Sequence, residues 1–174
     1  LTFTNKAARE MKERIIQLVG NTDAKNVWMG TFHSVFARIL RIEGNRLGYP
    51  SNFSIYDTDD SKRLIKSIIK ENNANDKVYT PNIVLIRISA AKTNLVTADQ
   101  YLNSDELRLQ DQMAAKPLLG EFYKMYAQRC FKASAMDFDV LLLNTYIMLQ
   151  KFPDLPLKYQ RKFNFILVDE YQDT

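Results

Sequence analysis

The end of the chain constrains the fold most, because four apolar residues at 165–168 run directly into the acidic pair Asp169 and Glu170. A short continuous apolar run is typical of a strand buried on both faces, as in a parallel sheet covered by helices. In open α/β sheets the chemistry lies just beyond the carboxyl ends of such strands. We therefore predict an α/β fold with Asp169 and Glu170 at a functional edge. The alternative is a strand followed by an acidic, solvated turn.

The acidic pair suits nucleotide hydrolysis. A carboxylate at a strand tip can hold Mg²⁺, which takes oxygen ligands and keeps several of its waters. A second carboxylate beside it can orient or deprotonate an attacking water. The full string Val-Asp-Glu-Tyr-Gln-Asp-Thr at 168–174 resembles the Walker B box, or motif II, of superfamily 1 DNA helicases of the UvrD/Rep/PcrA type.

Length and composition narrow the class of protein. A chain of 174 residues can bury a sizeable core as one domain, or as one domain with an insertion. The balance of 24 basic and 20 acidic residues, a net charge of +4, permits a polyanionic partner without demanding one. The single cysteine, Cys130, excludes an internal disulfide and a cysteine-based zinc site, fits a reducing cytosol, and is expected to be a small buried hydrophobe.

The sequence has no segment that suggests a membrane or a secretory route. No apolar run approaches the roughly 20 residues that a membrane span needs, and there is no signal-peptide pattern. We expect a cytoplasmic protein. The chain starts at Leu1 without a methionine and stops just after the acidic box, so we expect a piece of a longer protein.

The first residues predict a strand that gives way to a helix. Residues 1–4 are expected to be the tail of a strand, and Asn5 is a good N-cap for a helix through about Val19, closed by Gly20 and Asn21.

The start of this first helix is a candidate nucleic-acid contact. Backbone N–H groups at Thr4, Asn5 and Lys6 would point outward and bind phosphate readily. Phe3 could offer a ring for a base to stack on, and its alternative is an ordinary core phenylalanine. The string Thr-Phe-Thr-Asn-Lys-Ala-Ala at 2–8 resembles motif Ia of the same helicases, which contacts single-stranded DNA.

A second candidate contact follows a second predicted strand at 27–31. Hydroxyls and an imidazole at a helix start can donate to phosphates, and Thr31 and His33 lie at such a start. The string Thr-Phe-His-Ser at 31–34 resembles motif Ib, a further DNA-contacting box. Alone, His33 would more often be structural. Because the chain has one histidine, a multi-histidine metal centre is excluded.

Apart from a short apolar–polar alternation at 53–56, which is extended at most, residues 44–129 carry helical signals. We therefore predict that they form an inserted subdomain between the two parts of a motor core, 1–43 and 130–174. Helix starts are expected at Asp57 or Thr58, at Thr80-Pro81 and at Thr97, with a further polar helix at 104–114. The strings Asn-Phe-Ser-Ile-Tyr-Asp at 52–57 and Ile-Ser-Ala-Ala-Lys at 88–92 resemble the helical insertion of these helicases, subdomain 1B. There Lys92 would touch phosphate; the alternative is a solvated lysine.

The stretch after the insertion predicts one more helix start. Asp137 is expected to cap a helix that begins at Phe138, and its charge suits the helix dipole. The string Met-Asp-Phe-Asp at 136–139 resembles motif Id. Val140 stands where the family commonly has a second aspartate, which leaves the role of Asp139 open.

The phosphate cradle of a helicase motor, Gly-x-x-x-x-Gly-Lys-Ser/Thr, is missing from this stretch. None of the five glycines is followed by lysine. The resemblance therefore covers the first motor domain from motif Ia through motif II: a partial RecA-like P-loop NTPase parallel sheet with a large all-helical inserted subdomain. We expect no ATPase activity from these residues alone.

The resemblance implies a parent enzyme that moves 3′→5′ on single-stranded DNA using ATP and Mg²⁺, in DNA replication or repair. In it, Asp169 would hold Mg²⁺, Glu170 would act as general base, and Gln172 would sense the γ-phosphate or attacking water. Expected partners are single-stranded DNA and single/double-strand junctions, and no membrane. Unpaired sheet edges could also self-associate. The alternatives are a DNA-binding or interaction module, or part of a helicase–nuclease of the RecB/AddA kind.

Overall fold

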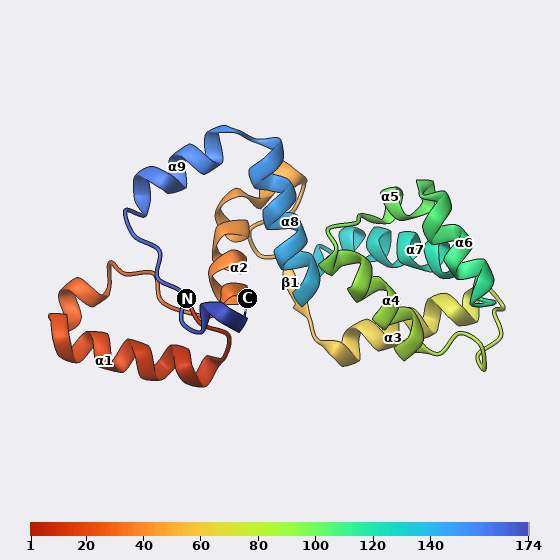
Figure 1. Ribbon diagram of the computed structural model, residues 1–174, viewed down its shortest axis with the longest axis horizontal. Coiled ribbons are helices and arrows are strands. Elements are labelled where there is room, and N and C mark those ends of the chain that lie inside the picture. Colours follow the sequence, from red (N-terminus) through yellow and green to blue (C-terminus); the bar gives the residue numbers. More distant parts are fainter. Residues whose placement is uncertain (174) are drawn as a thin grey trace. The chain divides into compact units, whose positions relative to one another are not determined.

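The computed structural model describes residues 1–173, with Asp173 described by its backbone alone. The chain divides into two compact units (Figure 1). Unit 1 comprises Leu1–Leu47 together with the segment from Asn144 on, and unit 2 is Gly48–Leu143. No helix within residues 1–173 is both long enough and apolar enough to cross a membrane.

Unit 1 contains helices α1 (Asn5–Ala24), α2 (Phe32–Glu43) and α9 (Asp154–Lys162), the 3₁₀ turns η1 (Gly44–Leu47) and η2 (Tyr171–Asp173), and most of α8 (Phe138–Lys151). Helices α2 and α9 are joined by buried Glu43. Its carboxylate accepts hydrogen bonds from Lys158 Nζ at 2.5 Å and from the Tyr159 hydroxyl at 3.2 Å. Burial, and then Glu43, raises the pKa of Tyr159 to about 12.

Both predicted ends of the first helix need correction. Thr4, not Asn5, is the N-cap of α1, because its hydroxyl accepts the backbone N–H of Ala7 at 3.1 Å and its own backbone is extended. The predicted end near Val19 is a kink, not a terminus. Gly20 takes a left-handed φ of 80°, and helical turns resume beyond it to Ala24. Gly20 does interrupt the helix, as its sequence position predicted. A glycine alone does not determine whether helical turns resume after it.

The strands predicted in unit 1 are reduced to short backbone pairings. Thr2 and Thr31 form an isolated parallel bridge, and residues 27–31 form no strand. Residues 1–2 also pair with the closing segment on their other side. The Leu1 amino group donates to the Leu167 carbonyl at 2.6 Å, and the Asp169 N–H donates to the Leu1 carbonyl at 2.8 Å. Residues 1–2 therefore lie between two parallel segments, the one around Thr31 and the one at 167–169.

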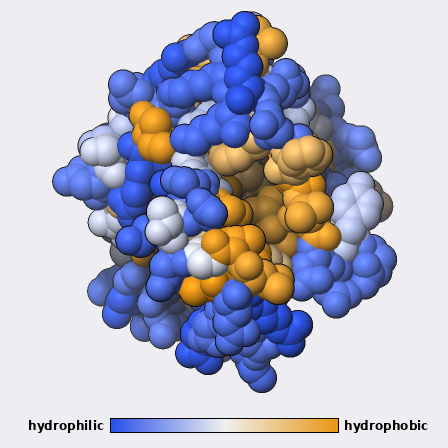
Figure 2. Space-filling view, turned by 90° about the vertical axis from the view of Figure 1, so that its left-hand side faces the viewer, coloured by the Kyte–Doolittle hydropathy of each residue, from blue (hydrophilic) through white to orange (hydrophobic). Residues whose placement is uncertain are grey.

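The prediction that residues 165–168 form a strand buried on both faces is wrong for this structure. Phe165, Ile166 and Leu167 are 87%, 68% and 82% exposed, and no strand is formed there. Such a strand is buried only when neighbours pair with both of its edges and helices cover its faces. Among residues 1–173, backbone pairing of this segment extends only to Leu1. Figure 2 shows apolar side chains gathered on the face turned toward the viewer.

Unit 2 is mostly helical and has one short parallel pair of strands. Strands β1 (Ser54–Tyr56) and β2 (Ala135–Asp137) pair in register from Ser54 opposite Ala135 to Tyr56 opposite Asp137. Extended structure at β1 was the most that the sequence indicated, and β2 was not predicted. The remaining elements of unit 2 are α3 (Thr58–Glu71), α4 (Pro81–Thr93), α5 (Ala98–Asn103), α6 (Asp105–Met113), α7 (Leu119–Lys132) and the start of α8.

The helices of unit 2 pack around one continuous core. Its centre holds side chains that are almost fully buried, including Ile65 and Ile68 of α3, Val84 of α4, and Phe122 and Tyr126 of α7. Cys130 is buried in this core, as predicted, and burial raises the pKa of its thiol to about 11. Unit 2 therefore has the small-domain arrangement in which each helix covers a shared apolar centre.

Local signals predicted the helix starts of unit 2 well. Asp57 caps α3 in a capping box with Asp60, and Thr80 caps α4 with Pro81 at the first helical position. Thr97 caps α5 in a capping box with Gln100. The polar helix predicted at 104–114 is α6. These predictions are confirmed because a cap depends on residues within one turn of each other.

Candidate functional site

The acidic box lies at the end of the closing segment of unit 1. Asp169 and Glu170 are exposed, and the Asp169 backbone is held by its hydrogen bond to Leu1. Glu170 has a left-handed φ of 52°, and the Gln172 side-chain amide donates a hydrogen bond to the Glu170 carboxylate. The structure therefore brings the side chains of Glu170 and Gln172 into contact; the sequence predicted a role for each but no bond between them. Thr174, the last residue of the box, lies outside the described residues.

An open hollow of about 470 Å³ belongs to unit 2, and a second of about 430 Å³ lies beside the acidic box in unit 1. The unit 1 hollow is lined by apolar side chains of α1 and of the closing segment and by three charged residues, Glu10, Arg14 and Asp169. Asp169 thus stands at the rim of a space whose walls combine apolar and charged side chains.

The donors at this rim fit a magnesium ion that arrives with a nucleotide. Mg²⁺ is usually bound by one or two carboxylates together with substrate phosphates, and it keeps several waters. Asp169 and Glu170 supply two adjacent exposed carboxylates. Within residues 1–173 no group of three or more acidic, histidine or cysteine side chains forms a cage for an ion.

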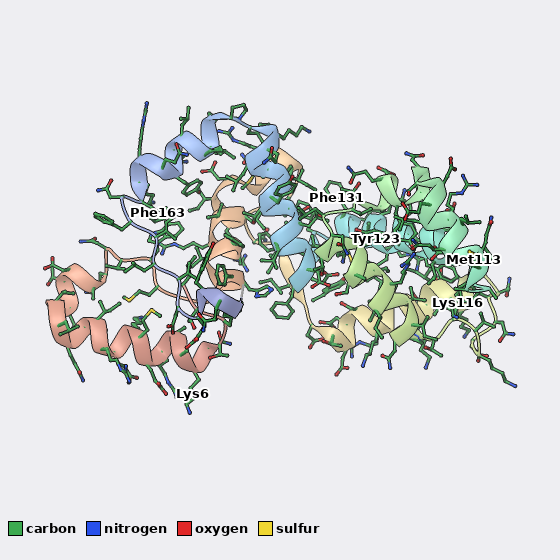
Figure 3. All side chains as sticks on the ribbon, viewed as in Figure 1. Lys6, Met113, Lys116, Tyr123, Phe131 and Phe163 are labelled. Carbon is green, nitrogen blue, oxygen red and sulfur yellow. The ribbon has the colours of Figure 1, made fainter. Side chains whose placement is uncertain are left out.

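The motif Ia residues form an exposed stretch at the start of α1. Phe3 is 45% exposed, and Thr4, Asn5 and Lys6 are exposed as well. Figure 3 shows the Lys6 side chain pointing away from α1 into solvent. The Thr4 hydroxyl oxygen is already used as the cap of α1. The Ala7 N–H is occupied by this cap, which leaves the Asn5 and Lys6 N–H groups and the Lys6 ammonium for an anion.

The motif Ib residues lie at the start of α2 and are less exposed. Thr31 is 7% exposed, and its hydroxyl accepts the Ser34 N–H at 3.2 Å as the N-cap of α2. The Ser34 hydroxyl donates back to the Thr31 carbonyl at 2.8 Å. His33 is half-buried. In this structure Thr31 therefore builds the helix start, while His33 lies at its surface.

The two boxes are held side by side by backbone hydrogen bonds. The Thr2 N–H donates to the Gly30 carbonyl at 3.2 Å, and the Phe32 N–H donates to the Thr2 carbonyl at 3.3 Å. A Cβ at Gly30 would come within 2.4 Å of the Ser34 hydroxyl oxygen, so glycine permits the close approach of this segment to α2. Phe3 and Phe32 consequently meet, with ring centroids 5.3 Å apart.

Lys92 lies in unit 2 and is buried, only 3% exposed, rather than solvated. Its ammonium forms a 2.5 Å ion pair with the Asp137 carboxylate, and the Tyr126 hydroxyl donates to the same carboxylate oxygen at 2.7 Å. Neither alternative from the sequence, a phosphate contact or a solvated lysine, describes this position. One signal was available: Lys92 falls four residues after Ile88, on the inward face of α4.

Asp137 fills both roles that its position allows. Its Oδ1 accepts the Val140 N–H at 2.8 Å, which confirms the predicted cap of α8, while Oδ2 takes the bonds from Lys92 and Tyr126. Burial by itself would raise the pKa of Asp137, but the Lys92 charge and these hydrogen bonds outweigh it and hold the pKa below its usual value. The sequence missed this network because its members lie far apart along the chain.

Comparisons with known proteins agree with the motifs. The sequence profile of the UvrD/REP helicase N-terminal domain matches residues 1–174. Over its whole length the chain is 41% identical to the ATP-dependent DNA helicase PcrA of Bacillus subtilis and 37% identical to that of Leuconostoc citreum. It is 40% identical to PcrA of Staphylococcus aureus over 175 aligned residues. The chain spans between 22% and 23% of the length of these relatives.

Proposed function

The chain belongs to the UvrD/REP helicase family as its N-terminal domain, and from this premise we propose that it carries the DNA-contacting and water-activating part of an ATP-dependent 3′→5′ DNA helicase. One observation supports this proposal most directly. Residues 1–2 pair on one side with the acidic box, through Leu1, and on the other side with the motif Ib segment, through Thr2. A shift in one box would therefore reach the other through a single backbone segment.

The proposed DNA contacts are all in unit 1. Phe3 would stack on a base, and the first turn of α1, with Thr4, Asn5 and Lys6, would hold the phosphates. Thr31 and His33 would add contacts at the start of α2. Lys92 is left out of the DNA-binding set because its ammonium is buried against Asp137. Single-stranded DNA and its junctions with duplex are the proposed partners.

The proposed nucleotide chemistry rests on the acidic box. Asp169 would be the metal ligand, Glu170 the general base for the attacking water, and Gln172 the residue that links the base to the γ-phosphate. Bound Mg²⁺ would neutralise charge on the transferred phosphate. The hydrogen bond between Gln172 and Glu170 supports a shared role for the two side chains.

The domain organisation of the proposal follows the sequence. Residues 1–43 and 130–174 would belong to a RecA-like motor core, and 44–129 would form subdomain 1B. The compact units divide between Leu47 and Gly48, close to the first of these boundaries, and between Leu143 and Asn144, fourteen residues after the second. The second division places the motif Id string in unit 2, because Asp137 is bonded there to Lys92 and Tyr126.

DNA binding by the chain tests the proposal. We expect a fluorescently labelled oligothymidylate to bind, with an affinity that falls as salt rises, because phosphate contacts release counterions. Replacing Lys6 with Ala should lower the salt slope by about 0.7. The matched control is Lys66→Ala, an exposed lysine of unit 2. Binding that is absent, or that is insensitive to salt, contradicts the proposal and favours an inert scaffold or an interaction module.

Nucleotide hydrolysis tests the assignment of the acidic box. We expect no magnesium-dependent ATPase from these 174 residues, because the sequence carries no Gly-Lys-Ser/Thr cradle. In the intact parent enzyme, Glu170→Gln should leave ATP binding in place and nearly abolish turnover, since the amide cannot accept the proton of the water. Undiminished turnover in that variant would remove the general-base role.

A further inference from the structure

A row of three aromatic rings runs from the interior side of α2 to the motif Ia segment. Phe36 and Phe32, one helical turn apart, have ring centroids 6.3 Å from each other. Phe32 and Phe3 are 5.3 Å apart, with their planes tilted by 49°. Tilted pairs at this distance are favourable aromatic contacts, so each ring restrains the next.

The backbone fixes the end of the row. Phe32 is the first residue of α2, directly after the Thr31 cap, and its N–H is bonded to the Thr2 carbonyl at 3.3 Å. The positions of the Phe32 and Phe3 backbones are thus tied together through Thr2. Phe3 has few other restraints, because it is 45% exposed and lies just before the helix. The orientation of its ring therefore depends on Phe32.

We propose that Phe32 is a positioning residue that holds the Phe3 ring in the orientation in which it stacks on one base of single-stranded DNA. The inference rests on the proposed function, in which Phe3 contacts the base. Phe32 itself is half-buried between Phe36 and Phe3, and acts through Phe3. Stacking needs a ring that is already oriented, because a freely rotating ring loses conformational freedom when a base binds.

The test measures stacking as well as affinity. An oligothymidylate with one 2-aminopurine is titrated with the chain, and the fluorescence of 2-aminopurine reports whether it is stacked. Phe3→Ala should weaken binding by about 5-fold or more and abolish the fluorescence change. Phe32→Leu, which keeps an apolar side chain but removes the ring, should weaken binding by about 3-fold or more and reduce the fluorescence change. Phe32→Tyr, which restores a ring, should recover both signals.

A matched control separates positioning from general loss of an aromatic pair. Phe131 is 47% exposed and contacts Tyr49 with ring centroids 5.0 Å apart, within unit 2. Figure 3 shows Phe131 on α7. Phe131→Leu should leave affinity and 2-aminopurine fluorescence unchanged. Circular dichroism establishes that each variant is folded, and Phe36→Leu provides a second way to loosen Phe32 if Phe32→Leu does not fold.

The outcomes distinguish the base contact of Phe3 from the positioning role of Phe32. Weak binding and lost stacking in Phe3→Ala, together with wild-type binding and stacking in folded Phe32→Leu, overturn the positioning role alone. Unchanged binding in Phe3→Ala overturns both the base contact and the positioning role. A loss in Phe32→Leu that Phe32→Tyr does not repair also contradicts positioning, because the ring would then not be the group that matters.

Discussion

Unit 2 holds a continuous core of buried side chains, although a few of its apolar residues, such as Ile86 and Met113, are exposed, whereas the apolar run at 165–167 of unit 1 lies in water. In unit 2, Ile68 and Tyr126 are completely buried in the core. In unit 1, Phe165 and Leu167 are more than 80% exposed. Unit 2 therefore resembles a self-contained helical domain, whereas the acidic box of unit 1 follows an exposed apolar segment. We expect the stability of the chain to reside mainly in unit 2.

The largest expected loss of stability follows from breaking the buried ion pair of unit 2. Replacing Lys92 with Met would leave the Asp137 carboxylate buried without its ion pair, which should cost about 3–5 kcal/mol of the free energy of unfolding of unit 2. Chemical denaturation followed by circular dichroism measures this loss.

The double variant Lys92→Met with Asp137→Asn is the control for the charge pair. It should recover much of the loss, because no unpaired charge remains. A single Lys92→Met variant as stable as the wild type would contradict the role of the pair.

The next largest loss of stability is expected from truncating a buried apolar side chain, and the same truncation in each unit compares the two units directly. Ile68→Ala should destabilise unit 2 by about 2–5 kcal/mol, because Ile68 is completely buried. Leu167→Ala in unit 1 should change stability by less than about 0.5 kcal/mol, because Leu167 is 82% exposed. Thermal and urea unfolding measure both losses. Equal losses in the two variants would contradict the difference in packing between the units.

Acid should weaken unit 2 through Asp137. The pKa of this carboxyl lies below its ordinary value, because the Lys92 charge and hydrogen bonds outweigh the effect of burial. A group with a depressed pKa stabilises the fold above its unfolded pKa, about 3.9, and this stability is lost as pH falls through the folded pKa.

Urea unfolding at pH 7 and at stepwise lower pH measures the acid effect. We expect the Asp137 contribution to be constant down to about pH 5 and to decrease progressively as the pH falls further toward the folded pKa. In Asp137→Asn this part of the acid dependence should be absent. The exposed Asp76→Asn serves as the control. An acid dependence that is identical in wild type and Asp137→Asn would contradict the assignment.

The smallest expected effect is a gain in stability from a substitution at the end of α6 in unit 2. Ala115 follows α6 with a φ of 54°, in a turn where its N–H bonds to the Gln112 carbonyl and the Lys116 N–H bonds to the Asp111 carbonyl. Glycine favours this left-handed position. Ala115→Gly should therefore stabilise unit 2 by about 1 kcal/mol. Ala114→Gly, one residue earlier at a φ of −77°, should not stabilise it. Thermal unfolding of both variants checks the sign.

The sequence predicted the features that depend on neighbours along the chain. The caps at Asp57, Thr80, Thr97 and Asp137 are confirmed, since a side chain and an N–H three residues later determine each of them. The motifs also identified the family, because four short strings occur in the family's order.

Features that depend on distant residues could not be predicted in this way. Lys92 and Asp137 are 45 residues apart, and neither local pattern indicates the other. Strand β2 exists only because β1 pairs with it. The apolar run at 165–168 has the composition of a buried strand, but burial requires neighbours on both edges, and composition cannot supply them.

Amide hydrogen exchange with and without a saturating oligothymidylate tests most directly whether the proposed DNA-contacting boxes of unit 1 form one surface next to the acidic box. We predict added protection in residues 1–6 and 30–34, with the helices α3, α4 and α7 of unit 2 unchanged. Protection confined to unit 2, or none at residues 1–6 and 30–34 under conditions where the DNA is bound, would contradict the proposed DNA-binding surface.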